Sequence, residues 1–172
     1  MRDTEKPTVV TKNIIVQLNA AGNATISNSE VNDGSSDNCT LQANLIFETN
    51  IKSFSCSDIG SPVTVTLKVT DASGNTATAT ATVIVVDNTP PTVNTKNATI
   101  YLNANGQATL TVAQVNNNST DNCSIPSNGY MLSKTSFDCS NVGPNIVTLK
   151  VTDANGNTAT ATAIVTLSLI HI

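Results

Sequence analysis

The chain has 172 residues, a net charge of −4, 12% charged residues and 3% aromatic residues, with no tryptophan. The absence of a lysine or arginine cluster argues against a nucleic-acid partner. No apolar run approaches the ~20 residues that span a bilayer. Valine, threonine, alanine and asparagine dominate, and together they favour strands and turns over helices. The composition therefore predicts an all-β protein.

The chain repeats itself at an offset of about 84 residues. The triplet at 7–9 returns at 91–93, the Asp-Asn-Cys triplet at 37–39 returns at 121–123, and the long stretch at 65–83 returns at 147–165. We therefore expect two tandem domains, residues 1–87 and residues 88–172, joined near a stiff pair of prolines.

Alternating apolar and polar residues predict short strands in each repeat. Between the second and third strands of the first repeat we expect a polar loop at 28–38 with at most one helical turn. Strands of this length and spacing predict two immunoglobulin-like β-sandwich domains. The expected strands cover 14–18, 23–27, 45–49, 53–57, 63–70 and 76–86, then 99–102, 107–112, 130–133, 136–139, 146–152 and 158–166.

The stretch at 65–83 predicts a β-hairpin with one face packed on the core and one face exposed to solvent. Val65, Leu67 and Val69 share a face with the alanines of the returning strand, and the threonines share the other face. Asp-Ala-Ser-Gly-Asn at 71–75 supplies the turn, in which Gly74 or Asn75 can adopt a positive φ.

Each repeat contains two cysteines, Cys39 and Cys56 in the first and Cys123 and Cys139 in the second. The spacing shows no C-x-x-C and no histidine partner, which argues against a zinc site. The pairing that respects the repeat is one disulfide per domain, Cys39–Cys56 and Cys123–Cys139. Such disulfides predict an oxidising compartment outside the cytoplasm.

The motifs Val-Thr-Asp-x-x-Gly-Asn before the last strand and Asp-Asn-Thr-Pro-Pro at the join resemble those of hyalin-repeat (HYR) and related bacterial immunoglobulin-like domains. The resemblance covers nearly the whole chain, although animal hyalin repeats carry a cysteine after Gly-Asn where this chain has threonine and alanine. The resemblance implies a secreted or cell-surface protein with a role in adhesion or in spacing other domains.

Calcium is the one cofactor that the sequence suggests, because hard oxygen ligands gather at the join. We expect any such ion to use Asp87, Asn88 and possibly Asp153. Asp3, Asp37, Asp71 and Asp121 also lie at joins or in loops. The alternative is that these residues are only turn formers, and no EF-hand pattern is present.

Neither a nucleophile with its base nor paired carboxylates in a cleft can be found in the sequence, so we do not expect an enzyme. The predicted function is a non-catalytic extracellular module, a stalk or adhesin segment of a larger bacterial surface or secreted protein. Its expected partners are neighbouring repeats, a cell-surface protein or a glycan. The alternative is a carbohydrate-binding or accessory module of a secreted hydrolase, which would normally show an exposed Trp/Tyr platform, and only Tyr101 and Tyr130 are available for one.

Both ends of the sequence suggest truncation. The chain starts inside a linker-like segment, and residues 167–172 depart from the ending of the first repeat. We expect those six residues to be either non-native or a divergent last strand, and we assign no function to His171.

Overall fold

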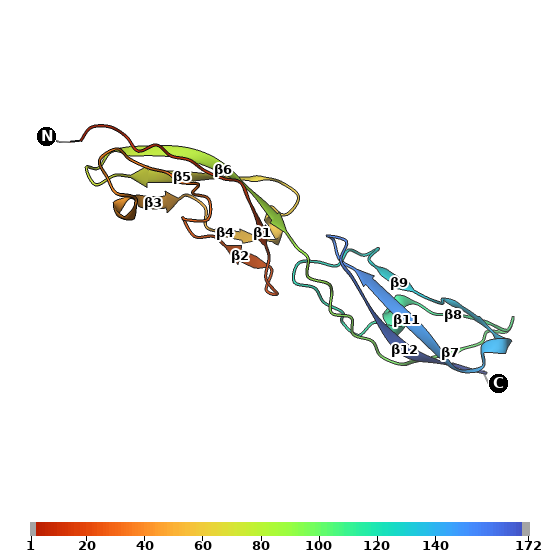
Figure 1. Ribbon diagram of the computed structural model, residues 1–172. Helices are drawn as coiled ribbons and strands as arrows, with labels where there is room; N and C mark the ends of the chain where they lie inside the picture. The colour runs from red at the N-terminus through yellow and green to blue at the C-terminus, as the bar shows by residue number, and fades with distance from the viewer. Residues whose placement is uncertain (1–2, 170–172) are drawn as a thin grey trace. The chain divides into compact units, whose positions relative to one another are not determined.

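The computed structural model describes residues 3–169 and divides into two compact units, Met1–Asp87 and Asn88–Ile172 (Figure 1). Each unit contains a four-stranded sheet and a two-stranded sheet, and the strand order is the same in both. The chain is therefore all-β, built as two immunoglobulin-like β-sandwich domains, as the sequence predicts.

The larger sheet of the first unit has the order β1 (Ile14–Gln17), β6 (Thr76–Val86), β5 (Val63–Thr70) and β3 (Ile46–Thr49). Its smaller sheet pairs β2 (Asn23–Thr25) with β4 (Ser53–Ser55). Two short 3-10 helices, η1 (Gln42–Asn44) and η2 (Cys56–Asp58), lie in the connections.

The second unit repeats this plan with β7 (Ala98–Tyr101), β12 (Thr158–Ser168), β11 (Gly143–Thr152) and β9 (Tyr130–Leu132), while β8 (Gln107–Thr109) pairs with β10 (Ser136–Asp138). A 3-10 helix, η3 (Cys139–Asn141), follows β10. One difference from the predicted strands concerns 107–112: β8 ends at Thr109, and a helical turn, α1 (Val112–Val115), begins after Thr111. The Thr111 amide donates to Gln114 Oε1 at 2.8 Å, a capping box that ends the extended conformation.

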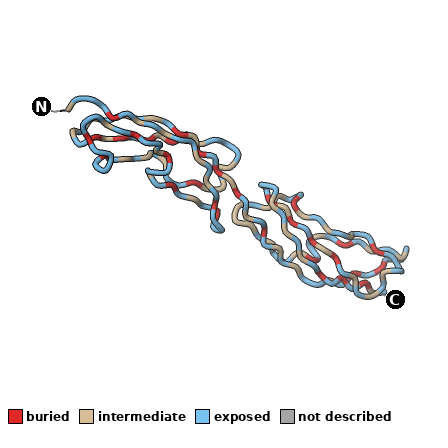
Figure 2. The backbone as a smooth tube through the Cα atoms, in the orientation of Figure 1, coloured by how far each residue is buried: buried red, intermediate tan, exposed pale blue. Residues whose placement is uncertain are grey.

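The core of each unit is built on its longest hairpin, as the alternation predicts. Val65, Leu67 and Val69 are fully buried on β5, and the register places them opposite the alanines of β6. The threonines at 76, 78 and 80 are exposed, and Figure 2 shows buried and exposed residues alternating along these strands. Gly74 takes the positive φ of the turn, at 90°.

The first strand of each unit pairs in parallel with the last, so that Ile14 lies opposite Val83 in β1 and β6. Before β1, the leading segment 3–13 already follows β6. Thr11 Oγ1 donates to Thr80 O at 2.7 Å, and Asn13 Oδ1 accepts from the Thr82 amide at 2.8 Å. These contacts hold a segment that has no strand of its own against the edge of the sheet.

The last strand continues into the six residues that depart from the first repeat. Leu167 of β12 is 1% exposed and lies opposite Gly143 of β11, and Ser168 ends β12. Leu167 and Ser168 therefore belong to the sandwich. Residues 170–172, which include His171, lie outside the described part of the chain, so the prediction for them stays a prediction.

Gly129, just before β9, offers a sharp test of this packing. A Cβ at Gly129 would lie 2.3 Å from Thr152 O, while the Gly129 carbonyl accepts the Thr152 amide at 2.8 Å. We expect Gly129→Ala to lower the free energy of unfolding of the second unit by about 1–3 kcal/mol, because backbone must move. Differential scanning calorimetry should show the loss. Asn128→Ala, at an exposed neighbour, should change stability by less than about 0.5 kcal/mol. Equal melting of both variants would contradict this account.

Candidate metal centre

A buried aspartate closes the long hairpin of each unit. Asp71 is 3% exposed, and its Oδ1 accepts from the backbone amides of Ser73 at 2.9 Å and Asn75 at 2.7 Å. Its Oδ2 accepts from Asn75 Nδ2 at 2.7 Å. Asp153, also 3% exposed, makes the same three bonds to Asn155 and Asn157. The turn sequence thus folds around a carboxylate that faces the interior.

The Asp71 carboxylate remains ionised in this setting. Burial acts to raise the pKa of Asp71, but the hydrogen bonds from Asn75, Ser73 and Gly74 outweigh it and hold the pKa below its ordinary value. The first unit therefore carries a buried negative charge at this turn at neutral pH.

A second carboxylate comes from the polar loop before η1. Asp37 Oδ2 accepts from the backbone amides of Cys39 at 3.0 Å and Thr40 at 2.8 Å. Thr40 Oγ1 accepts in turn from the Ala72 amide at 3.2 Å, which ties the loop to the hairpin turn. In the second unit, Asp121 Oδ2 accepts in the same way from the backbone amides of Cys123 and Ser124.

The third carboxylate comes from the leading segment. Asp3 Oδ1 accepts from the Glu5 amide at 3.0 Å, and the Asp3 carbonyl accepts from Asn75 Nδ2 at 3.2 Å. One carboxylate oxygen each from Asp3, Asp37 and Asp71 lies within 4.8 Å of the others. Three segments distant in sequence thus meet at one end of the sandwich.

We refer to this group as the Asp3 cluster. By the repeat, Asp121 and Asp153 of the second unit are the counterparts of Asp37 and Asp71.

Several aspartate oxygens are buried without a hydrogen-bond partner in the described residues. They are Asp3 Oδ2 and Asp37 Oδ1 in the Asp3 cluster and Asp121 Oδ1 in the second unit. The other oxygen of each of these side chains accepts backbone amides. Each carboxylate is therefore held by one oxygen while the other has neither a donor nor water-accessible surface.

The calcium site that the sequence suggests at Asp87, Asn88 and Asp153 stays a prediction. The residues that the structure brings together within one unit are Asp3, Asp37 and Asp71, which the sequence analysis placed only at joins or in loops. The repeat carried a signal for this set, because each of the three aspartates has a counterpart one repeat later.

The cysteine pairing expected from the repeat is wrong. Cys39 and Cys139 are free thiols, whereas Cys56 and Cys123 are disulfide-bonded. The pairs Cys39–Cys56 and Cys123–Cys139 are therefore not formed in this structure.

The reason is the distance between the two cysteines of a repeat. Cys39 follows Asp37 and lies beside the turn where β6 begins, whereas Cys56 starts η2, and Ile59 just after it bridges to Val85 near the end of β6. The length of β6 between these points is about 30 Å, and a disulfide requires Cα atoms within about 7 Å. The second unit repeats the arrangement, with Cys123 beside Asp121 and Cys139 at η3.

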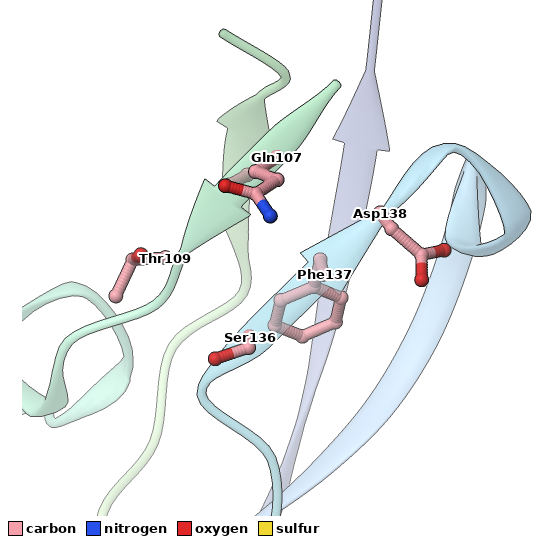
Figure 3. Close-up of a pocket in the computed structure, with 6 residues that line it drawn as sticks. Gln107, Thr109, Ser136, Phe137 and Asp138 are labelled. Atoms are coloured by element: carbon pink, nitrogen blue, oxygen red, sulfur yellow. The ribbon is translucent and has the colours of Figure 1, made fainter. Parts of the chain in front are cut away.

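A separate hollow of about 240 Å³ lies over β8 and β10 (Figure 3). Gln107 and Thr109 line it from β8, and Ser136 and Asp138 line it from β10. Asp138 Oδ1 accepts from the Ser140 amide at 2.8 Å and caps η3, and these Ser140 contacts lower the Asp138 pKa. The hollow therefore presents a capping carboxylate without a basic partner among its lining residues.

No known family profile matches the sequence, and no curated protein matches it. Solved structures with a similar fold include human mucin-like protocadherin EC1-2, at TM-score 0.42 and 12% identity over 95% of this chain and 98% of that chain. Human protocadherin-24 EC1-2 has TM-score 0.45 and 11% identity over 95% and 99%, and the four N-terminal Ig domains of Dscam1 isoform 8.4 have 0.40 and 9% over 96% and 47%. Likenesses this distant carry no conclusion about binding or activity.

The thiol assignment can be checked by alkylation of the folded protein without reductant, followed by peptide mapping. We expect Cys39 and Cys139 to be alkylated and Cys56 and Cys123 to be protected until reductant is added. A peptide in which Cys39 is linked to Cys56 would contradict the structure.

The negative potential of the Asp3 cluster can be read at Cys39. The Asp3 carboxylate first, then desolvation and the carboxylates of Asp37, Glu5 and Asp71, raise the pKa of the Cys39 thiol. Asp3→Asn removes the largest of these influences and should lower that pKa. Because the thiolate is the reactive form, Cys39 alkylation in EDTA at pH 8 should become faster. Asp33→Asn, an exposed change in the same loop, should leave the rate unchanged, and equal rates in both variants would contradict the account.

Proposed function

We propose that this chain is a non-catalytic extracellular repeat module, a stalk or adhesin segment of a larger bacterial surface or secreted protein. The observation that carries the proposal is the construction of the same sandwich twice, with one strand order and one hairpin register. Tandem repeats of this kind extend a chain by one unit at a time, and each unit supplies its own core.

Two further observations support an extracellular setting. Cys56 and Cys123 are disulfide-bonded, which is typical of proteins that fold in an oxidising compartment. Charged residues are sparse, and the exposed faces of the hairpins carry threonines in place of a charged surface. Within residues 3–169, no helix is long and apolar enough to cross a membrane.

The polar groups that could carry chemistry are occupied by structural bonds. Asp138 caps η3, and Asp71 and Asp153 close turns. These hydrogen bonds engage the carboxylates in caps and turns, which supports a structural role over a hydrolytic one.

A carbohydrate-binding role finds no support in the placement of the two tyrosines. Tyr101 lies on β7 opposite Ser168, and Tyr130 lies on β9 opposite Val151. Strands β7 and β9 are the two opposite edges of the larger sheet. The two rings therefore cannot form one platform on which a sugar would stack.

The proposal assigns neighbouring repeats of the same polypeptide as the immediate partners, with a cell-surface protein or glycan as the target of the whole molecule. An antibody to this chain should label intact cells that make the full-length protein, and protease added outside should remove the signal. Labelling only after permeabilisation would contradict the proposal.

A replacement experiment separates the two forms of the proposed role. Deleting both repeats from the full-length protein should reduce adhesion of the cells. Two unrelated immunoglobulin-like domains of equal length should restore adhesion if the repeats act as a spacer, and should fail if their surface is itself adhesive. Unchanged adhesion after deletion would contradict both.

A further inference from the structure

We propose that Asp3, Asp37 and Asp71 bind one calcium ion in the first unit. The inference concerns a cation site in the chain itself and does not depend on the stalk or adhesin role. It rests on two independent observations, the convergence of three carboxylates and the presence of buried oxygens among them that no donor reaches.

The unpartnered oxygens are stronger evidence for a bound cation than the negative charge of the cluster alone. Buried polar atoms in native proteins nearly always have a partner, and an exception points to an absent water or ion. Asp3 Oδ2 and Asp37 Oδ1 are both such exceptions, and both belong to one cluster. Desolvating an ionised carboxylate without compensation costs far more than desolvating a neutral group. A cation at the centre of the cluster would satisfy both oxygens at once.

The donor set favours calcium, and the spacing of the oxygens is compatible with it. Calcium binds oxygen ligands at about 2.3–2.6 Å, so two ligands on one ion lie at most about 5 Å apart. The oxygens of the Asp3 cluster lie within 4.8 Å of one another, which meets that limit. Magnesium requires about 2.0–2.1 Å and a stricter octahedron, and zinc prefers nitrogen and sulfur ligands over an all-carboxylate set. Water or backbone carbonyls would complete the calcium shell.

The surrounding hydrogen bonds orient the ligands. The amides of Cys39 and Thr40 bind Asp37 Oδ2 and leave the buried Oδ1 without a donor. Asn75 Nδ2 donates both to Asp71 Oδ2 and to the Asp3 carbonyl, so it couples the turn to the leading segment. Outer contacts of this kind fix ligand direction in metal sites. The site is thus arranged before an ion arrives.

A bound ion would have a structural consequence. It would add a link between the leading segment, the loop that holds Asp37 and the β5–β6 turn. The Thr8–Ser36 bridge and the bond from Asn75 Nδ2 to the Asp3 carbonyl already connect these segments. A proton shared among the carboxylates is the competing way to relieve their repulsion. The two explanations differ in whether calcium at neutral pH has any effect.

Isothermal titration of the full chain with calcium chloride at pH 7 tests the proposal. We expect the Asp3 cluster to bind one equivalent, with a dissociation constant of about 10⁻⁴–10⁻³ M or tighter, as in extracellular calcium modules. Asp37→Asn keeps an acceptor oxygen for the Cys39 and Thr40 amides but removes a charge, and should lose this equivalent. Asp33→Asn, the same change at an exposed position four residues earlier, should retain it. Unchanged binding by Asp37→Asn, or no binding by the unmodified chain, would overturn the proposal.

Thermal unfolding supplies a readout that does not depend on the titration. The unmodified chain should melt at a higher temperature in calcium than in EDTA, because an ion that binds only the folded state stabilises it. Asp3→Asn lies outside every strand and serves as a second variant if Asp37→Asn misfolds. It should lose part of the calcium-dependent shift, while Asp33→Asn keeps it whole. An unmodified chain that melts at one temperature in calcium and in EDTA, and is stabilised only by acid, would identify a shared proton and overturn the calcium site.

Discussion

The structure of each unit depends on one buried carboxylate at the turn of its longest hairpin. Asp71 accepts three hydrogen bonds from the turn that follows it, and this fixes the direction in which β6 leaves. The register of β5 on β6 follows from that turn and places Val65, Leu67 and Val69 in the core. The same carboxylate meets Asp3 and Asp37, so the element that organises the core also organises the acidic cluster.

The sequence predicted the fold well because alternation within a strand is a local property. The two long hairpins were placed to within a few residues at each end, since period-2 patterning and a glycine turn leave little freedom. The short turn α1 was missed because its signal is a capping box, Thr111 with Gln114, inside a stretch that also reads as strand. There the competing local bond, and not hydrophobicity, decided the conformation.

The candidate site was predicted only in part because it depends on contacts between segments far apart in sequence. Asp3, Asp37 and Asp71 were noted only at joins or in loops, and nothing local indicated that they would lie beside one another. The cysteine pairing failed for the same reason. Repeat symmetry shows that Cys39 and Cys123 are equivalent, but it does not show at which end of the sandwich each lies. That information resides in the bridge from Ile59 to Val85, which no local pattern reveals.

The parallel pairing of the first strand with the last has a mechanical consequence. The chain enters the first unit ahead of β1 and leaves it after β6, and these two strands are neighbours with four residue pairs from Ile14↔Val83 to Gln17↔Val86. A tension applied through the chain pulls the two strands past each other along their length, so their hydrogen bonds are loaded together and do not open one after another. The rate of forced unfolding is set by the barrier to that concerted slip. The second unit has the same geometry in β7 and β12, so each unit resists extension by the strand pair through which the load enters and leaves.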